Sequence, residues 1–257
     1  SYLPSQMYEV VRYMPAMKTQ WDAFVRKSRN GSFLFLRNYM DYHQQRFDDF
    51  SLLIYDRQSL VALLPLNKEV DGSVTSHGGL TYGGLITDKR AKTEKVMHMF
   101  VCLNLWLRNA GITRVVYRPV PWIYHEMPAE EDLYALVNIC NARLVAREIY
   151  STIAQENKIS FSQSRKDCLR KAERLGVSVA SSDDFATFWE VLSFNLQQRY
   201  GVSPVHSLAE IKTLATLFPQ HIRLYVAYLG EEMVAGTVVY VMPRVVHVQY
   251  ISASPKG

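Results

Sequence analysis

The chain has 257 residues, of which 48% are hydrophobic, 12% aromatic and 21% charged. This composition can bury a core, and it excludes an intrinsically disordered or fibrous protein. Lysine and arginine number 29 against 24 acidic residues, and the resulting net charge of +5 is a mild excess that suits anionic ligands without identifying one.

The cysteines and the apolar runs indicate in which cellular compartment the protein is expected. Cys102, Cys140 and Cys168 are odd in number and lack CxxC spacing, so we expect neither a disulfide framework nor a zinc site. No run approaches the roughly 20 apolar residues of a membrane helix, and the N-terminus lacks a basic-then-apolar signal pattern. We therefore expect a cytoplasmic protein without a transmembrane segment.

Hydrophobic periodicity predicts mixed helices and strands in the first half. Trp21, Phe24 and Val25 follow the i, i+3, i+4 spacing of a core-facing helical stripe. The predicted elements are strand 7–13, helices 17–28 and 35–47, hairpin strands 51–55 and 60–66, helix 92–109, strand 113–118, helix 129–140 and an extended segment at 143–154 expected to finish the first sheet. Residues 76–85 form a loop whose four glycines permit close backbone approach and positive φ.

Capping signals mark the helices of the second half. Ser162, Asp183 and Ser207 can each cap a helix, and Glu210 completes a capping box with Ser207. The predicted elements are helix 162–175, strand 177–180, helices 185–200 and 207–219, and strands 223–229, 233–242 and 245–252.

The order of strand, two helices and antiparallel strands occurs twice, over residues 7–66 and 177–252. We therefore predict an α/β (α+β) fold of two tandem lobes, residues 1–155 and 156–257, with mixed, mostly antiparallel sheets flanked by helices. The first copy continues into a long helix. The second reaches its last strand near the final residue, so we expect the second lobe to be incomplete.

Four stretches of sequence carry a resemblance to a known family. They are NGSFLFLRNYMDYHQQRF at 30–47, SHGGLTYGG at 76–84, SRKDCLRKAERLGVSV at 164–179, and PVHSLAEI with HVQYISAS at 204–211 and 247–254. With the order of elements, they resemble the GNAT superfamily, specifically its double-lobed branch related to the FemAB peptidoglycan aminoacyltransferases and the cellulose-biosynthesis-type acetyltransferases. The resemblance implies two GNAT-like lobes and an acyl-transfer activity.

For chemistry, the resemblance implies transfer of an acyl group, such as acetyl, from acyl-CoA to the amine of a small-molecule or peptide-like acceptor, without a metal. Family members hold the CoA pyrophosphate on main-chain N–H groups of a Q/R-x-x-G-x-G/A loop. That pattern does not occur in this chain. Two alternatives are therefore open: FemAB-like transfer of an amino acid from aminoacyl-tRNA to a cell-wall precursor, and a non-catalytic binding protein on the same fold. The sequence indicates no oligomeric state.

The predicted helix at 162–175 has a cationic face. Helical spacing places Lys166, Arg170, Lys171 and Arg174 together on it. Such a face is often simply solvated, but it also matches what a phosphate or carboxylate ligand needs. The resemblance favours ligand binding by Arg170 and Lys171.

The last predicted strand carries polar residues in an otherwise apolar run. Alternation puts His247 and Gln249 on one face and Tyr250 on the other. Imidazole titrates near neutral pH, so His247 suits a general base toward an amine, with His206 as its partner. Each histidine also fits a packed side chain satisfied by one hydrogen bond. Given the resemblance, we predict His247 and His206 as catalytic residues and Gln249 as a substrate ligand.

A second group of candidates lies in the first lobe. Helical spacing puts Tyr39 and His43 on a common side, which we expect to face the glycine-rich loop that contains His77 and Tyr82. These four side chains are predicted to line a substrate cleft. The alternative is that they are ordinary half-buried packing residues.

Overall fold

The chain divides into two compact units. The structure is a computed structural model that describes residues 8–43, 46–76, 78, 80 and 82–257. The first unit is Ser1–Arg143 with Met242–Val245, and the second is Leu144–Val241 with Val246–Gly257. The boundary lies before the expected residue 155, and the turn at 242–245, which is distant in sequence, groups with the first unit.

One sheet of the first unit is antiparallel. Its strands, in spatial order, are β1 (Glu9–Arg12), β3 (Leu52–Asp56), β4 (Ser59–Leu64) and β7 (Ile86–Thr87). Leu52, Leu53 and Ile54 are all fully buried, so β3 is covered on both faces. The hairpin predicted at 51–66 is thereby confirmed.

The other sheet of this unit forms because strands change partners at breaks in the chain. Its strands, in spatial order, are β2 (Asp48–Asp49), β5 (Leu66–Lys68), β6 (Val74–Ser76) and β8 (Val115–Val116). Pro65 lacks an amide hydrogen and separates β4 from β5, so the two parts of one run join different sheets. The strands β6 and β8 are parallel, and their register joins Val74 to Val115 and Thr75 to Val116.

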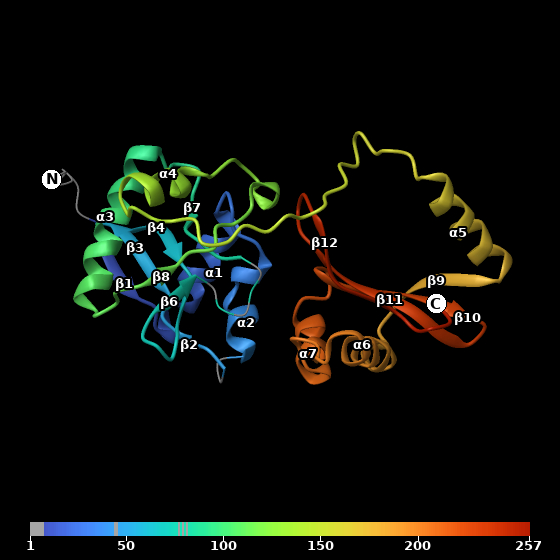
Figure 1. The fold of residues 1–257 in the computed structure, drawn as a ribbon. Coiled ribbons are helices and arrows are strands. Elements are labelled where there is room, and N and C mark those ends of the chain that lie inside the picture. Colours follow the sequence, from blue (N-terminus) through green and yellow to red (C-terminus); the bar gives the residue numbers. More distant parts are fainter. Residues whose placement is uncertain (1–7, 44–45, 77, 79, 81) are drawn as a thin grey trace. The chain divides into compact units, whose positions relative to one another are not determined.

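Helices lie on both sides of these strands (Figure 1). They are α1 (Lys18–Lys27), α2 (Arg37–Met40), α3 (Thr93–Asn109) and α4 (Glu131–Asn138), with 3-10 turns at Pro15–Met17, Phe33–Phe35, Asp41–His43 and Trp122–Tyr124. The long helix α3 was predicted, and its buried stripe, which includes Val96, Met99 and Leu103, packs into the core of the unit. Burying each such side chain stabilises the fold by about 1.5–3 kcal/mol.

The single helix predicted at 35–47 is wrong, because the chain leaves the α-helix after α2. The guanidinium of Arg37 is buried, and its Nη2 donates to Asp41 Oδ1 at 2.6 Å and to Asp49 Oδ2. A buried cation is costly unless it is paired. Because Asp49 lies on β2, the chain must turn back soon after α2 to supply this carboxylate.

The NGSF stretch has a structural role. The side chain of Asn30 donates from Nδ2 to Leu85 O at 2.8 Å, and its Oδ1 accepts from Thr87 N–H at 3.0 Å. It therefore binds both sides of the start of β7. At Gly31, an added Cβ atom would overlap Ser28 Oγ, so a side chain there would clash.

The segment at 143–154 does not finish the first sheet, which corrects that expectation. It has no regular secondary structure, and every one of its residues is exposed. A strand requires a partner for its main-chain groups. The strand β8, at the end of its sheet, is only two residues long and is followed by Pro119, so it offers little edge for pairing.

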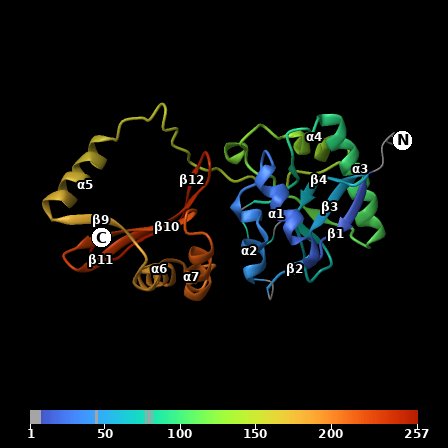
Figure 2. The ribbon, with the colours of Figure 1, turned by 180° about the vertical axis from the view of Figure 1, so that it is seen from behind.

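The second unit is one antiparallel sheet with helices. Its elements are α5 (Gln163–Arg174), β9 (Val177–Ser182), α6 (Phe185–Tyr200), α7 (Leu208–Leu217), β10 (Ile222–Leu229), β11 (Glu232–Val241) and β12 (Val246–Ala253). The spatial order of the strands is β12-β11-β10-β9. The helices α6 and α7 lie on one side of the sheet and α5 stands on the other (Figure 2). The predicted elements of this half are confirmed.

The capping predictions hold with one shift. Ser162 accepts from Arg165 N–H at 3.3 Å, and the box of Ser207 with Glu210 is present. At α6 the cap is Asp184 rather than Asp183, because the Asp184 side chain accepts from the main chain of Thr187.

Close packing of α6 on β11 holds the sheet to its helices. Phe188 is fully buried, and it lies against Gly236 of β11. A Cβ atom on Gly236 would lie 2.5 Å from Phe188 Cδ2, so the ring occupies the space that a side chain would fill. This contact fixes the position of α6 beside β11 and β12.

Candidate active site

The strand β12 carries a β-bulge. It lies at one end of the spatial order and pairs with β11. The register joins Val239 to Val248 and Val238 to Tyr250, so it passes over Gln249. The extra residue shifts the alternation of side chains beyond it. Tyr250 therefore lies on the same face as His247, not on the opposite face as strict alternation predicted.

On this face Tyr250 meets His206. The Nδ1 atom of His206 lies 2.5 Å from Tyr250 Oη, and the main-chain N–H of His206 donates to the same oxygen at 3.3 Å. The indole of Trp189, on α6, packs against the Tyr250 ring at 5.2 Å and donates to His206 O at 3.1 Å. His206 is 2% exposed, so its side chain lies inside the domain, behind Tyr250.

Gln249 is the extra residue of the bulge, between Val248 and Tyr250. Burial is the larger effect on both neighbouring titratable groups of β12. It lowers the pKa of His247 and raises the pKa of Tyr250, and the main-chain N–H of His206 opposes the shift of Tyr250. His247 is therefore a neutral, half-buried imidazole near pH 7.

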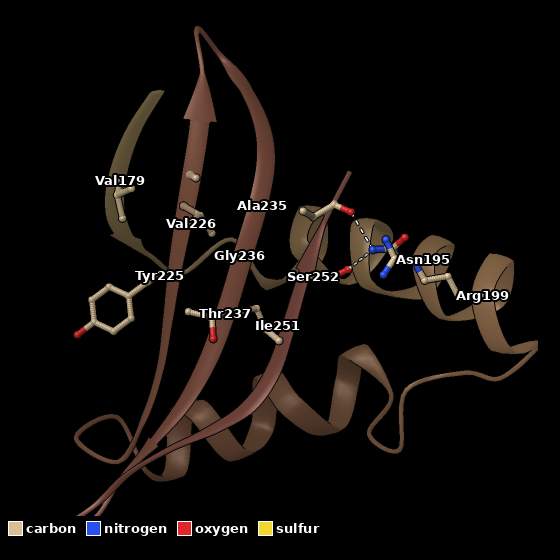
Figure 3. Close-up of a pocket in the computed structure, with 12 residues that line it drawn as sticks. Val179, Asn195, Arg199, Tyr225, Val226, Ala235, Gly236, Thr237, Ile251 and Ser252 are labelled. Carbon is tan, nitrogen blue, oxygen red and sulfur yellow. Dashed lines mark hydrogen bonds between the residues drawn. The ribbon is translucent and has the colours of Figure 1, made fainter. Parts of the chain in front are cut away.

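A hollow of about 400 Å³ crosses the strands of the same sheet (Figure 3). Its lining includes Val179, Tyr225, Thr237 and Ile251 from the strands and Asn195 and Arg199 from α6. The Nδ2 atom of Asn195 donates to Ser252 Oγ at 2.9 Å and to Ala253 O at 2.8 Å, which ties α6 to the end of β12. The exposed guanidinium of Arg199 adds a positive charge to this mainly apolar hollow.

In the first unit, hydrogen bonds hold together the segments that follow the parallel strands β6 and β8. The hydroxyl of Ser76 accepts from Arg118 N–H at 2.7 Å and donates to Arg118 O at 3.3 Å. Gly83 N–H donates to the same carbonyl, and Leu85 N–H donates to Tyr117 Oη at 2.6 Å. The N–H groups of Arg118, Gly83 and Leu85 are thus engaged within the unit and are not open to a bound phosphate.

Comparison with known proteins assigns the second half. Residues 160–257 match a family model described as an acetyltransferase (GNAT) domain. We call this matched segment, residues 160–257, the GNAT domain. The predicted acyltransferase class is thereby confirmed for this part of the chain. No curated protein sequence matches the chain.

Two solved structures are similar to the whole chain. The crystal structure of FemX is 10% identical, with a TM-score of 0.63, and the match covers 96% of this chain and 81% of FemX. At that identity the likeness establishes the fold, in agreement with the predicted mixed α/β architecture. A GCN5-related N-acetyltransferase from Kribbella flavida is 13% identical, covering 98% of this chain and 58% of its own, but its TM-score of 0.36 adds nothing to the assignment.

Within the GNAT domain, His206 hydrogen bonds with Tyr250, and His247 lies on the same face of β12 as Tyr250. Sequence reasoning missed Tyr250, because strict alternation placed it on the face opposite His247. The one available signal was a glutamine between a histidine and a tyrosine in an otherwise apolar strand. Catalysis by His247 and His206 stays a prediction.

The basic helix of the GNAT domain lies beside the opposite edge of the sheet. Arg170 and Lys171 are exposed on α5, which contacts β9, and Arg170 pairs with Asp167 at 3.1 Å. Three strand spacings, about 14 Å in all, separate β9 from β12. The structure therefore does not bring Arg170 or Lys171 next to His247.

Of the four candidates from the first unit, the structure describes the side chains of Tyr39 and Tyr82, and both are buried. Tyr39 is 1% exposed and packs edge-on against Phe33, while Tyr82 is 3% exposed and stacks on Tyr124. Both are core residues, which corrects the expectation that they line a cleft. His77 lies outside the described residues. The backbone of His43 belongs to a 3-10 turn, and its side chain also lies outside the described part.

Other site chemistries receive no support in the described part of the chain. No group of three His, Cys, Asp or Glu residues there is placed to hold a metal ion. The three cysteines are free thiols. None of the described helices has the length and the apolar run that crossing a bilayer requires.

Proposed function

We propose that the GNAT domain transfers an acyl group from acyl-CoA to an amine, with His247 as the general base. The observation that carries this proposal is the half-buried imidazole of His247, which the bulge of β12 places on the same face as Tyr250 and its partner His206. The acceptor is an amine on a small molecule or peptide. Free thiols and a CoA donor fit the cytoplasmic setting expected from the sequence.

Acyl transfer to an amine requires a base for the amine proton, alignment of the donor with the acceptor, and stabilisation of the negative charge on the carbonyl oxygen. When bound, the thioester supplies an activated acyl group. His247 accepts one proton from the ammonium, and the amine nitrogen so formed bonds to the acyl carbon as the carbon–sulfur bond breaks. The second proton that the nitrogen loses goes to the leaving thiolate, which gives the amide and free CoA thiol. Outward main-chain N–H groups of β12 are the donors available to the developing oxyanion, because this strand lies at the edge of its sheet.

Part of the second unit fits acyl-CoA. The apolar walls of the hollow suit an acyl or pantetheine chain, and Arg199 suits a phosphate. The first unit does not fit, since Ser76, Tyr117 and the loop main chain fill the end of the β6–β8 pair. We therefore assign the activity to the second unit.

We further propose that the first unit is a second, non-catalytic GNAT-like lobe. The order of its elements supports this: a strand, two helices, antiparallel strands, a long helix, then a strand parallel to β6 and another helix. The FemX likeness, which covers 96% of the chain, also supports a two-lobed arrangement.

The test is acyl transfer by the purified 257-residue protein, followed as release of free CoA thiol with a panel of amines. Replacing His247 with Gln is expected to lower kcat by about 10²- to 10⁴-fold, the usual contribution of a general base. An Arg223→Gln variant, on the exposed side of β10, serves as a matched surface control. Absence of both turnover and thermal stabilisation with any acyl-CoA would contradict the proposal.

A second candidate function follows from α5. No residue of this helix is buried, so its basic side chains are accessible to a phosphate polymer. Together with the FemX-like fold, this favours transfer from aminoacyl-tRNA to a cell-wall precursor as the alternative. Salt-sensitive tRNA binding that weakens in an Arg170→Gln/Lys171→Gln double variant would support it. No retention of tRNA at low salt would remove it.

A further inference from the structure

The first unit contains a small polar pocket lined by the β3–β4 hairpin and the start of α3. Its volume is about 120 Å³, and Tyr8, Asp56, Ser59 and Lys95 contribute polar groups to its lining. We call it the Tyr8 pocket. We propose that it binds a small zwitterionic amino acid, whose ammonium group pairs with Asp56 and whose carboxylate pairs with Lys95. The pocket belongs to the first unit and shares no residue with the proposed active site.

The hydroxyl of Tyr8 is the buried group that indicates ligand binding. The residue is 5% exposed, and its Oη atom is buried without a hydrogen-bond partner among the described residues. A buried hydroxyl without a partner destabilises a fold. Because Tyr8 lines the pocket, a ligand seated there can make this hydrogen bond. Burial raises the pKa of Tyr8, and the charge of Asp56 acts in the same direction, so the hydroxyl keeps its proton at neutral pH and can donate it.

Core packing and sheet pairing hold Tyr8 in place. Its side chain belongs to the same buried cluster as Val96 and Met99 of α3. The antiparallel register of β1 with β3 joins Glu9 to Tyr55, and this places Tyr8 opposite Asp56. The residue that supplies the hydroxyl is therefore fixed beside the residue that supplies the carboxylate.

Two opposite charges line the pocket without pairing. Asp56 is half-buried at the end of β3, and Lys95 lies in the first turn of α3. Within the part of the chain that the structure describes, neither side chain makes an ion pair or a hydrogen bond. By contrast, Asp88 and Arg90 of the same lining pair with each other at 2.9 Å. The pocket thus presents one carboxylate and one ammonium group that remain open to a ligand.

Charges of both signs select a zwitterion. Asp56 attracts an amine that Lys95 repels, and the reverse holds for a simple carboxylate. An α-amino acid carries both charged groups on one carbon, so it can bridge two side chains that do not meet. The start of α3 adds to the attraction for the carboxylate, because a helix N-terminus is positive and no side chain caps this one.

The size and the remaining wall of the pocket limit the side chain of the ligand. Val61 and Met99 contribute apolar surface. Pockets for drug-sized ligands are several times larger, at about 300–1,000 Å³. We therefore expect a short, apolar side chain such as the methyl group of alanine.

The test is a ligand-observed NMR titration of the full 257-residue protein with L-alanine. Ethylamine and propionate are the matched probes, because each keeps one of the two charged groups of alanine and lacks the other. We expect saturable binding of L-alanine and much weaker binding of both probes. No saturable binding of L-alanine, or equal binding of either probe, would overturn the proposal.

Removing either charge should weaken binding. Asp56→Asn and Lys95→Gln should each raise the Kd for L-alanine by about 10-fold or more, because each loses a charge-assisted hydrogen bond. The matched control is Lys89→Gln, which removes an exposed lysine from the segment that leads into α3 but does not line the pocket. An equal loss of affinity in the control would show a general charge effect and contradict the assigned contacts.

Tyr8→Phe separates a binding role from a structural one. Removing a hydroxyl that has no partner should leave the Tm of the ligand-free protein unchanged or raise it by a few degrees, while the Kd for L-alanine rises about 10-fold. Tyr134→Phe, at an exposed tyrosine of α4, should change neither quantity. A fall in Tm, or a wild-type affinity for L-alanine in the folded Tyr8→Phe protein, would contradict the role of the hydroxyl.

Discussion

At the scale of single residues, the buried carboxyl of Asp132 shows how environment controls a titration. Its Oδ2 accepts from the hydroxyl of Tyr117 at 2.6 Å, and its Oδ1 accepts from Leu133 N–H at 2.8 Å. Burial is the larger effect, and it raises the pKa of Asp132 to about 6. The same physics lowers the pKa of His247, because in both cases the apolar surroundings penalise the charged form.

This shift predicts a pH dependence of stability. The folded protein binds the Asp132 proton more tightly than the unfolded chain, whose pKa is near 3.8. The stabilising contribution is therefore complete below pH ~4 and is lost as the pH rises through about 6, by up to about 3 kcal/mol. Urea unfolding of the wild type and of Asp132→Asn at pH 4 to 7 measures it. A constant difference between the two proteins over that range would contradict the prediction.

At the scale of elements, the contact of α6 with the sheet sets the position of the hydrogen-bonded pair of Tyr250 and His206. Trp189 and Asn195 of this helix contact the Tyr250 ring and the end of β12 respectively. Both depend on the close approach at Gly236, where Phe188 fills the space of a missing side chain. The packing of one helix therefore supports both the hydrogen-bonded pair and the hollow.

A Gly236→Ala substitution should destabilise the second unit. The added methyl would overlap the Phe188 ring, which is fully buried, and overpacking of this kind costs about 1–3 kcal/mol. Urea unfolding gives the measurement. The double variant Gly236→Ala/Phe188→Leu should lose less stability than the sum of the two single changes. Strict additivity would show that the two positions do not compete for the same space.

At the scale of the whole molecule, the chain contains two units joined through an exposed segment. Residues 143–154 have no regular secondary structure, and their apolar side chains, such as Leu144, Ile149 and Ile153, are exposed. The sequence had predicted an extended segment there that finishes the first sheet. The main chain of residues 143–154 pairs with no strand, because strand formation depends on a partner elsewhere in the fold and not on the local sequence alone.

Limited trypsin digestion should cut this segment first. Exposed chain without regular structure is the preferred site of proteolysis, whereas helices and sheets protect their bonds. We expect early cleavage after Arg143, Arg147 or Lys158, giving two large fragments whose new N-termini are read by sequencing. Early cleavage within α3 or within residues 177–241 instead would contradict the division into these two units.

Much of the fold could be predicted from sequence because its signals are local. Periodicity located α3 and α6, and the box of Ser207 with Glu210 marked the start of α7. The helix predicted at 35–47 failed because the buried Arg37 requires a carboxylate from β2. No local propensity carries that requirement.

The candidate site divides in the same way. Sequence by itself determined the mixed α/β class, the strand that carries His247, and the residue types suited to proton transfer, since these follow from spacing and side-chain chemistry. Only the tertiary structure decided that a bulge at Gln249 brings Tyr250 onto the face of His247, that Tyr39 and Tyr82 are buried, and that Arg170 lies at the far edge of the sheet. The physical reason is that register, burial and pairing depend on partners distant in the chain, which no window of sequence contains.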